Sequence, residues 1–299
     1  MQIDAATENP QMRYKHQSSI FTILRKGVMK TLQYALIVLI GLLFLIPWIW
    51  LVSTSLKAPS QIMEVPPRLI PRPVKWINYF YGVTNIKFGK YLKNTLIVCG
   101  TVLVGRIFSC TVVAYALSKI KWFGRDLLFT IVLGTMMLPG QVLLIPIFII
   151  FSRLGWVNTF LPLTVPSFFG NAFFIFMMRQ FFISIPEELT DAARIDGASH
   201  FDIYWRIIMP LSKPALATLI AYTFIWTYTD FQNPLIYLKD RDLWTLSLGM
   251  QGYLKRYGAT GTALGAMMAG ATLYTLPMIV LFFFAQKRLI QGMVTTGFK

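Results

Sequence analysis

The chain has 299 residues, of which 56% are hydrophobic and 13% are charged. Soluble domains carry about a quarter charged residues, so this composition excludes an ordinary soluble protein. The formal net charge of +16 would suit nucleic acid, but no basic helix or RNA-binding motif accompanies it. Basic residues that flank membrane spans and face anionic lipid explain the sign of the charge. We therefore predict an integral membrane protein that does not bind nucleic acid.

Six apolar runs with few or no charges are long enough to cross a bilayer as helices. In chain order they cover residues 31–56, 94–118, 127–152, 154–178, 214–238 and 257–286. A polar head, residues 1–30, precedes them, and a tail, residues 287–299, follows. The sequence therefore predicts an all-α membrane domain of six transmembrane helices over residues 31–286.

Proline and glycine mark breaks within these runs. Pro139, Gly140 and Pro146 interrupt the third run and are expected to kink or break it. Arg153 alone separates the third run from the fourth, so a tight hairpin is expected there, and Gly155 nearby suits a turn.

The last run opens with several glycines among alanines. Gly261 and Gly265 form a G-x-x-x-G step, which lets helices approach closely. We therefore expect tight helix packing at the start of the sixth span.

Basic residues next to the first span indicate its orientation. Arg25, Lys26 and Lys30 lie directly before it, and the first span usually dominates topology. Both termini are therefore expected in the cytoplasm, with the chain in the inner (cytoplasmic) membrane of a bacterium. The segments then placed outside are also basic, which suits either lipid headgroups or an acidic substrate or partner.

Residues with catalytic chemistry are sparse. His16 and His200 lie far apart, and the sequence has no metal-ligand cluster, no nucleophile beside a base and no phosphate-binding P-loop. Cys99 and Cys110 lie eleven residues apart in one apolar run, too far for a helix to join them as a disulfide. A membrane-embedded enzyme is therefore not expected.

Two charged residues fall inside the predicted spans. Arg106 sits in mid-run, where it either makes a structural contact to carbonyls or a neighbouring subunit or lines a transport pathway. Asp230 lies near the outer end of the fifth run, where exposure at the interface is the simple explanation and a pathway role the other. Neither forms a proton or sodium relay, which disfavours the alternative of a self-sufficient secondary sugar carrier. A transporter of this kind needs a partner that supplies energy.

The cytoplasmic segment between the fourth and fifth runs has the pattern of a helix, a turn and a second helix. Pro186 suits a first helical position, and Glu187 and Glu188 place negative charge near the helix N-terminus. Gly197 suits a left-handed cap at the end of that helix. Leu189, Ala192, Ala193 and Asp196 then share one face, where the two small alanines would let a partner approach.

The second helix of this segment is expected from about residue 200 to residue 208. Phe201, Tyr204, Trp205 and Ile208 would lie on one side of it and attach the segment to the spans. Pro210 and Pro214 end it before the next span.

This segment, residues 182–213, resembles the EAA loop of permease subunits in ATP-binding-cassette importers. That motif runs E-A-A, three residues, G, nine residues, then I-x-L-P. The corresponding residues here are Asp191-Ala192-Ala193, then Gly197, then Ile207-Ile208-Met209-Pro210. Asp191 for Glu and Met209 for Leu are mild departures, and the Asp196-Gly197-Ala198 step is typical of the sugar-importer branch.

From the first span to the tail, the chain is similar to the MalG-type permease subunits of carbohydrate importers. The resemblance implies a type I ABC importer permease fold and a heterodimer with a MalF-like permease. It also implies an extracytoplasmic solute-binding protein and two cytoplasmic ATPase subunits. Those ATPase subunits would hold ATP and Mg, and no cofactor is expected on this chain.

The resemblance also assigns roles to residues. A first set would couple the chain to the ATPase: Glu188, Asp191, Ala192, Ala193, Asp196, Gly197 and Pro210. A second set would form an outer loop that probes the binding protein: Tyr253, Leu254, Lys255 and Arg256. The tail near Thr295–Lys299 would reach toward the ATPase dimer. The expected cargo is an oligosaccharide, and the two basic residues of the loop motivate acidic sugars of the uronate or alginate type.

Overall fold

The computed structural model describes residues 10–297 of the backbone and the side chains of residues 27–286. Within this part of the chain the secondary structure is helical, without strands. The chain divides into two units, Met1–Ser53 and Thr54–Lys299.

The first unit is formed by α1, which runs from Pro10 to Ser55. Its stretch Gly27–Ser55 is apolar and long enough to cross a membrane, as predicted for the first span. Large hydrophobic side chains are exposed on all sides of this stretch, from Val28 to Trp50, as expected where lipid is the solvent. The helix is continuous across residue 30, so residues 10–30 of the head and the span are one element. The head's basic side chains before residue 27 lie outside the described residues.

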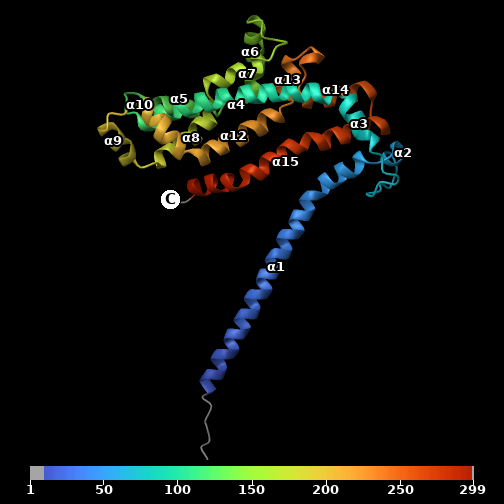
Figure 1. The fold of residues 1–299 in the computed structure, drawn as a ribbon, viewed down its shortest axis with the longest axis horizontal. Helices are drawn as coiled ribbons and strands as arrows, with labels where there is room; N and C mark the ends of the chain where they lie inside the picture. The colour runs from blue at the N-terminus through green and yellow to red at the C-terminus, as the bar shows by residue number, and fades with distance from the viewer. Residues whose placement is uncertain (1–9, 298–299) are drawn as a thin grey trace, which may run out of the picture. The chain divides into compact units, whose positions relative to one another are not determined.

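The second unit holds the other helices (Figure 1). In chain order they are α2 (Pro59–Ile62), α3 (Ile77–Thr84), α4 (Phe88–Lys119), α5 (Arg125–Thr135), α6 (Gly140–Arg153), α7 (Leu161–Thr164), the 3-10 helix η1 (Val165–Phe169), α8 (Ala172–Ser184), α9 (Glu187–Ile195), α10 (His200–Asp202), the π-helix η2 (Ile203–Ile208), α11 (Met209–Leu211), α12 (Lys213–Tyr228), α13 (Gln232–Tyr237), the 3-10 helix η3 (Arg241–Leu243), α14 (Leu246–Tyr257) and α15 (Gly261–Gly297).

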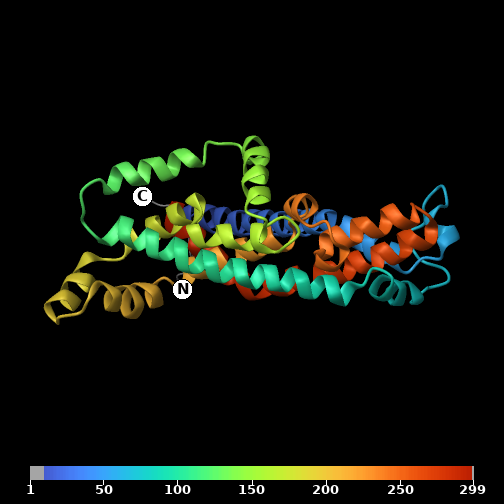
Figure 2. The ribbon, with the colours of Figure 1, turned by 90° about the horizontal axis from the view of Figure 1, so that it is seen from above.

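Helix α4 is the central helix of this unit and packs against α8, η1 and α12. Figures 1 and 2 show α9 beyond one end of α4, and α3 and α14 at the other. Asn94, near the start of α4, donates to the carbonyls of Asp242 and Trp244, whereas Lys119 at its end bonds the loop before α9. At about 1.5 Å per residue the two attachment points are roughly 37 Å apart. The two ends of the unit are therefore separated by about the thickness of a membrane.

The six predicted spans match the upper count of the structure. Four helical segments are long and apolar enough to cross a membrane, or up to six if each of two bent helix pairs is one span. One bent pair is α5 with α6, whose axes differ by 97° across the break at residues 136–139. This is the break predicted from Pro139 and Gly140. Gly155 takes a left-handed φ of 69° in the turn that follows α6, as expected for the hairpin.

Several predicted span boundaries were wrong. The second apolar helix begins at Phe88 rather than at residue 94, and the fourth ends at Ser184 rather than at residue 178. Three more boundaries lie where the backbone turns. The fourth apolar helical segment begins at Leu161 rather than at residue 154. The fifth ends at Tyr228 rather than at residue 238, and a turn in which the carboxylate of Asp230 accepts the Asn233 N–H separates it from α13. The sixth begins at Gly261 rather than at residue 257. At each of these three boundaries the uncharged run extends beyond the end of the helix, because the backbone turns there. At these points the apolar runs are therefore longer than the helices.

Candidate functional site

Helix α9 ends as the sequence predicts. Gly197 has a φ of +80°, its N–H donates to the carbonyl of Arg194, and the N–H of Ala198 donates to that of Ala193. These two bonds make a Schellman cap, which needs a left-handed residue at this position. Pro186 precedes the first helical residue and does not form it, which is a shift of one position from the prediction.

One side of α9 is exposed, and we call it the coupling face. It mixes acids with apolar groups, including Leu189 and Ile195, the latter 87% exposed. Ala193 packs against the apolar core and Thr190 is buried, so the prediction that both alanines face a partner is wrong for Ala193. The side chains of the coupling face are Glu188, Leu189, Asp191, Ala192, Ile195 and Asp196. Exposed apolar groups beside acids are typical of a surface that binds a protein partner.

The second helix begins with a capping box. The hydroxyl of Ser199 accepts from the Asp202 N–H, and the Asp202 carboxylate accepts from the Ser199 N–H. The hydrogen bond from the Ser199 hydroxyl lowers the pKa of Asp202. A lowered carboxyl pKa stabilises the fold above the ordinary pKa, and this stabilisation is lost as the pH falls through the lowered value. The cap therefore stays formed at neutral pH.

A π-helix changes which side chains of the second helix face the spans. Ile203, Tyr204 and Ile208 are buried, as the wide i to i+5 turn brings residues 203 and 208 to one side. Phe201 and Trp205 are 71% and 60% exposed. The prediction that all four aromatic and apolar residues attach this segment was therefore wrong for these two. The prediction differs because it places these four residues on one side of a helix with 3.6 residues per turn.

Four polar contacts attach the segment to the last turns of α4. The hydroxyl of Tyr115 lies 3.4 Å from Nδ1 of His200. The buried ammonium of Lys119 donates to the carbonyl of Ile185 over 2.6 Å. Arg194 of α9 donates to the carbonyl of Lys119 over 3.3 Å. The hydroxyls of Tyr204 and Thr111 are 2.7 Å apart. These contacts join α9 and the helix after it to α4. No local pattern signals these contacts, because they join residues far apart in the chain.

Replacing Lys119 with Met is expected to loosen this attachment. The Ile185 carbonyl would lose its donor, and a buried unsatisfied polar group costs about 1–3 kcal/mol. Lys121→Met is the matched control, because Lys121 is exposed. We expect a lower melting temperature for Lys119→Met than for Lys121→Met, measured on the purified protein. Equal values for the two variants would contradict the role given to Lys119.

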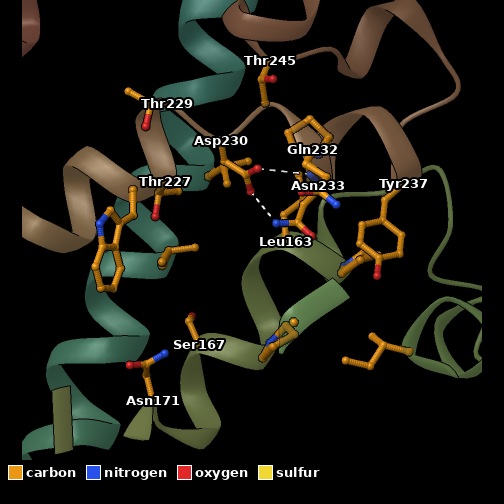
Figure 3. A pocket seen from close by; sticks show the side chains of 18 of the residues that line it. Leu163, Ser167, Asn171, Thr227, Thr229, Asp230, Gln232, Asn233, Tyr237 and Thr245 are labelled. Carbon is orange, nitrogen blue, oxygen red and sulfur yellow. Dashed lines mark hydrogen bonds between the residues drawn. The ribbon is translucent and has the colours of Figure 1, made fainter. Parts of the chain in front are cut away.

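A cavity of about 670 Å³ lies between α4, α6, η1 and the region that joins α12 to α13. Both candidate pathway residues, Arg106 and Asp230, line it. Figure 3 shows the carboxylate of Asp230 bonded to Asn233, which donates its side-chain amide over 2.8 Å and its backbone N–H over 3.2 Å. The structure thus brings together two residues that are far apart in the sequence.

Arg106 is held differently from Asp230. Its Nε and Nη1 atoms are buried and have no hydrogen-bond partner among the described residues. Its guanidinium carbon lies 5.4 Å from the ring centre of Phe174, a cation–π contact. The structural contact to carbonyls that the sequence left open is not found in this part of the chain.

The segment expected as an outer probing loop is the last part of helix α14. Tyr253 is buried in the core there, so it is turned away from any partner. Lys255 and Arg256 are exposed. Nearby, the ammonium of Lys90 lies 2.5 Å from Asp242 and lowers the pKa of that carboxyl. The tail side chains from residue 287 onward lie outside the described residues.

The described residues include few side chains that could bind a metal or take part in redox chemistry. Cys99 and Cys110 are buried and free. Among the described residues, no three His, Cys, Asp or Glu side chains form a group that could hold a metal.

Helices long and apolar enough to cross a membrane, with an open cavity between them, are the features expected of a helical membrane permease. Residues 107–295 match the model of the family described as binding-protein-dependent transport system inner membrane component. The chain belongs to this family. It is a permease subunit of an ABC transporter and not an enzyme. The alternative of a self-sufficient carrier is therefore not favoured.

Named relatives agree with this assignment. The chain is 32% identical over 260 residues to the sn-glycerol-3-phosphate transport system permease protein UgpE of Yersinia pestis bv. Antiqua (strain Antiqua), covering 85% of this chain and 92% of the relative. It is 31% identical over 265 residues to the arabinooligosaccharides transport system permease protein AraQ of Bacillus subtilis (strain 168), covering 87% and 92%.

A solved structure supports the fold. A chain of a bacterial ABC transporter involved in the import of the acidic polysaccharide alginate superposes with a TM-score of 0.76 at 24% identity. The match covers 91% of this chain and 98% of that one. The predicted fold, that of an ABC importer permease, is thereby confirmed.

Proposed function

We propose that the chain is one of two permease subunits in an ATP-driven importer that takes oligosaccharides from an extracytoplasmic binding protein. Its partners would be a MalF-like permease and two cytoplasmic ATPase subunits that hold ATP and Mg. The chain would lie in the inner membrane of a bacterium with both termini in the cytoplasm. The name of one relative, an arabinooligosaccharide permease, supports a sugar cargo.

The observation that carries this proposal is the coupling face. It is an exposed, acidic and apolar helix side on a segment that is bonded to α4 through Lys119, Arg194 and Tyr204. A partner that seats on this face and moves would displace α4 and the cavity that α4 lines. ATP-driven closure of the ATPase dimer is the movement proposed, and it would open the cavity outward to accept solute. Hydrolysis would reset it.

The two native cysteines are buried, which allows a selective crosslinking test. Ala192→Cys places a thiol on the coupling face, and Arg153→Cys places one at the exposed end of α6, on the opposite side of the membrane in the proposed topology. In membranes that contain the whole importer, we expect benzophenone maleimide, attached to the thiol of the Ala192→Cys variant and then illuminated, to join this variant to the ATPase subunit. The Arg153→Cys variant should give no such crosslink.

The same two variants test the orientation of the chain. An impermeant thiol reagent added from outside should label the Arg153→Cys variant and leave the Ala192→Cys variant unlabelled. Labelling of Ala192→Cys from outside would refute the topology. Absence of a crosslink between this variant and the ATPase would refute the docking.

A further inference from the structure

The cavity contains a positive charge that no group in the described chain neutralises directly. Arg106 lies in the middle of α4, with Nε and Nη1 both buried and without a hydrogen-bond partner among the described residues. A guanidinium carries five N–H donors, and buried charges in proteins are normally paired. An unpaired guanidinium beside a cavity is therefore suited to bind an anion.

Asp230 lines the same cavity but does not fill this role. Its carboxylate accepts both the amide and the backbone N–H of Asn233. No ion pair within 4.0 Å joins it to Arg106 among the described residues. The carboxylate of Asp230 is therefore hydrogen-bonded within its own turn, whereas, within the described chain, Nε and Nη1 of Arg106 are free to donate to a ligand.

The rest of the lining suits a sugar ring. Trp226 and Tyr237 supply aromatic faces, on which the C–H side of a pyranose packs. Asn171, Ser167 and Thr227 add amide and hydroxyl groups. The volume of about 670 Å³ falls within the range of sites that hold small ligands, roughly 300–1,000 Å³.

We propose that Arg106 binds an oxyanion of the transported solute, so that the importer carries an acidic saccharide, a sugar with a carboxylate or a phosphate group. This rests on the proposed function. The planar guanidinium matches either oxyanion with two parallel hydrogen bonds, which an ammonium does not. A cation–π contact with the ring of Phe174 of α8 holds the guanidinium in place.

The test uses the complete importer with its binding protein in proteoliposomes. The probes are a uronate trisaccharide, the neutral trisaccharide of the same linkage, and glycerol 3-phosphate, which separates a phosphate from a carboxylate source. Initial uptake of each probe is measured with Arg106→Gln and Arg106→Lys. Arg153→Gln is the matched control, because it removes an exposed basic residue away from the cavity lining.

We expect Arg106→Gln to lower the ratio of acidic to neutral uptake about tenfold or more, since hydrogen bonds to charged groups are among the stronger ones. Arg106→Lys should fall between Gln and the native residue, and Arg153→Gln should leave the ratio unchanged. An equal loss for all probes in Arg106→Gln would mean that Arg106 holds a neighbouring subunit, and would overturn the proposal. Native uptake of the neutral probe alone would also overturn it, while leaving the proposed function intact. Uptake of no probe would count against the proposed function itself.

Discussion

Gly197→Asp is expected to abolish solute uptake and solute-coupled ATP hydrolysis while the protein still inserts into the membrane. A Cβ at Gly197 would meet nothing within 4 Å in this chain, so the substitution creates no internal clash. Asp tolerates the left-handed φ of +80° better than most residues, so the cap of α9 should survive. The added carboxylate would instead project from the end of the coupling face, beside Asp196, where the ATPase is proposed to dock. A tenfold loss of activity would correspond to about 1.4 kcal/mol of lost docking.

Gly197→Asn is the control for this experiment. Asn has nearly the shape of Asp and the same tolerance of left-handed backbone, but it brings no charge. We expect it to retain more uptake and more co-purified ATPase than Gly197→Asp. Membrane insertion is checked by recovery of each variant in the detergent-extracted, monodisperse fraction. Full uptake by Gly197→Asp would refute the assignment of this loop as the coupling element.

Helix α9 and its glycine cap were predictable because their signals are local. Acids at the first turn, a left-handed glycine and a fixed spacing to Pro210 lie within a few helical turns of one another, and local backbone chemistry determines them. The break between α5 and α6 was predictable for the same reason, since Pro139 and Gly140 act on their own backbone. The π-helix was not predictable, because no residue type indicates an i to i+5 turn. An ordinary helical period puts Trp205 on the buried side, whereas the structure buries Ile203 there.

The cavity depended on contacts that sequence cannot show. Arg106 and Asp230 each stand out in the sequence as charges in apolar runs. Their shared cavity, however, arises from the packing of α4 beside the end of α12. The break after Tyr228 matters here, because it places Asp230 in the turn before α13, where its carboxylate accepts the Asn233 N–H. Likewise, nothing in the run 252–258 indicated that Tyr253 is buried, because the helix α14 was read as a loop.

Gly82→Ala is expected to destabilise the protein even though it adds only a methyl group. At Gly82 of α3, a Cβ would lie 2.7 Å from the carbonyl oxygen of Ala266 and 3.0 Å from the nitrogen of Gly270, both in the backbone of α15. Backbone atoms cannot rotate away, so the two helices would have to separate. The same small-residue seam includes Gly261, where a Cβ would lie 2.3 Å from the carbonyl oxygen of Pro59. This confirms the tight packing predicted from the glycines of the sixth span.

Overpacking of this kind costs about 1–3 kcal/mol, so we expect a clearly lower melting temperature for the detergent-purified importer. Gly100→Ala on α4 is the matched control, because a Cβ there meets nothing within 4 Å. Removing a helical glycine without a clash normally stabilises by about 0.4–1 kcal/mol, so the control should move the melting temperature in the opposite direction or leave it unchanged. Equal melting temperatures for the two variants would show that α3 and α15 do not touch through Gly82. Opposite shifts would establish that α3 and α15 are held together by close backbone contact at Gly82.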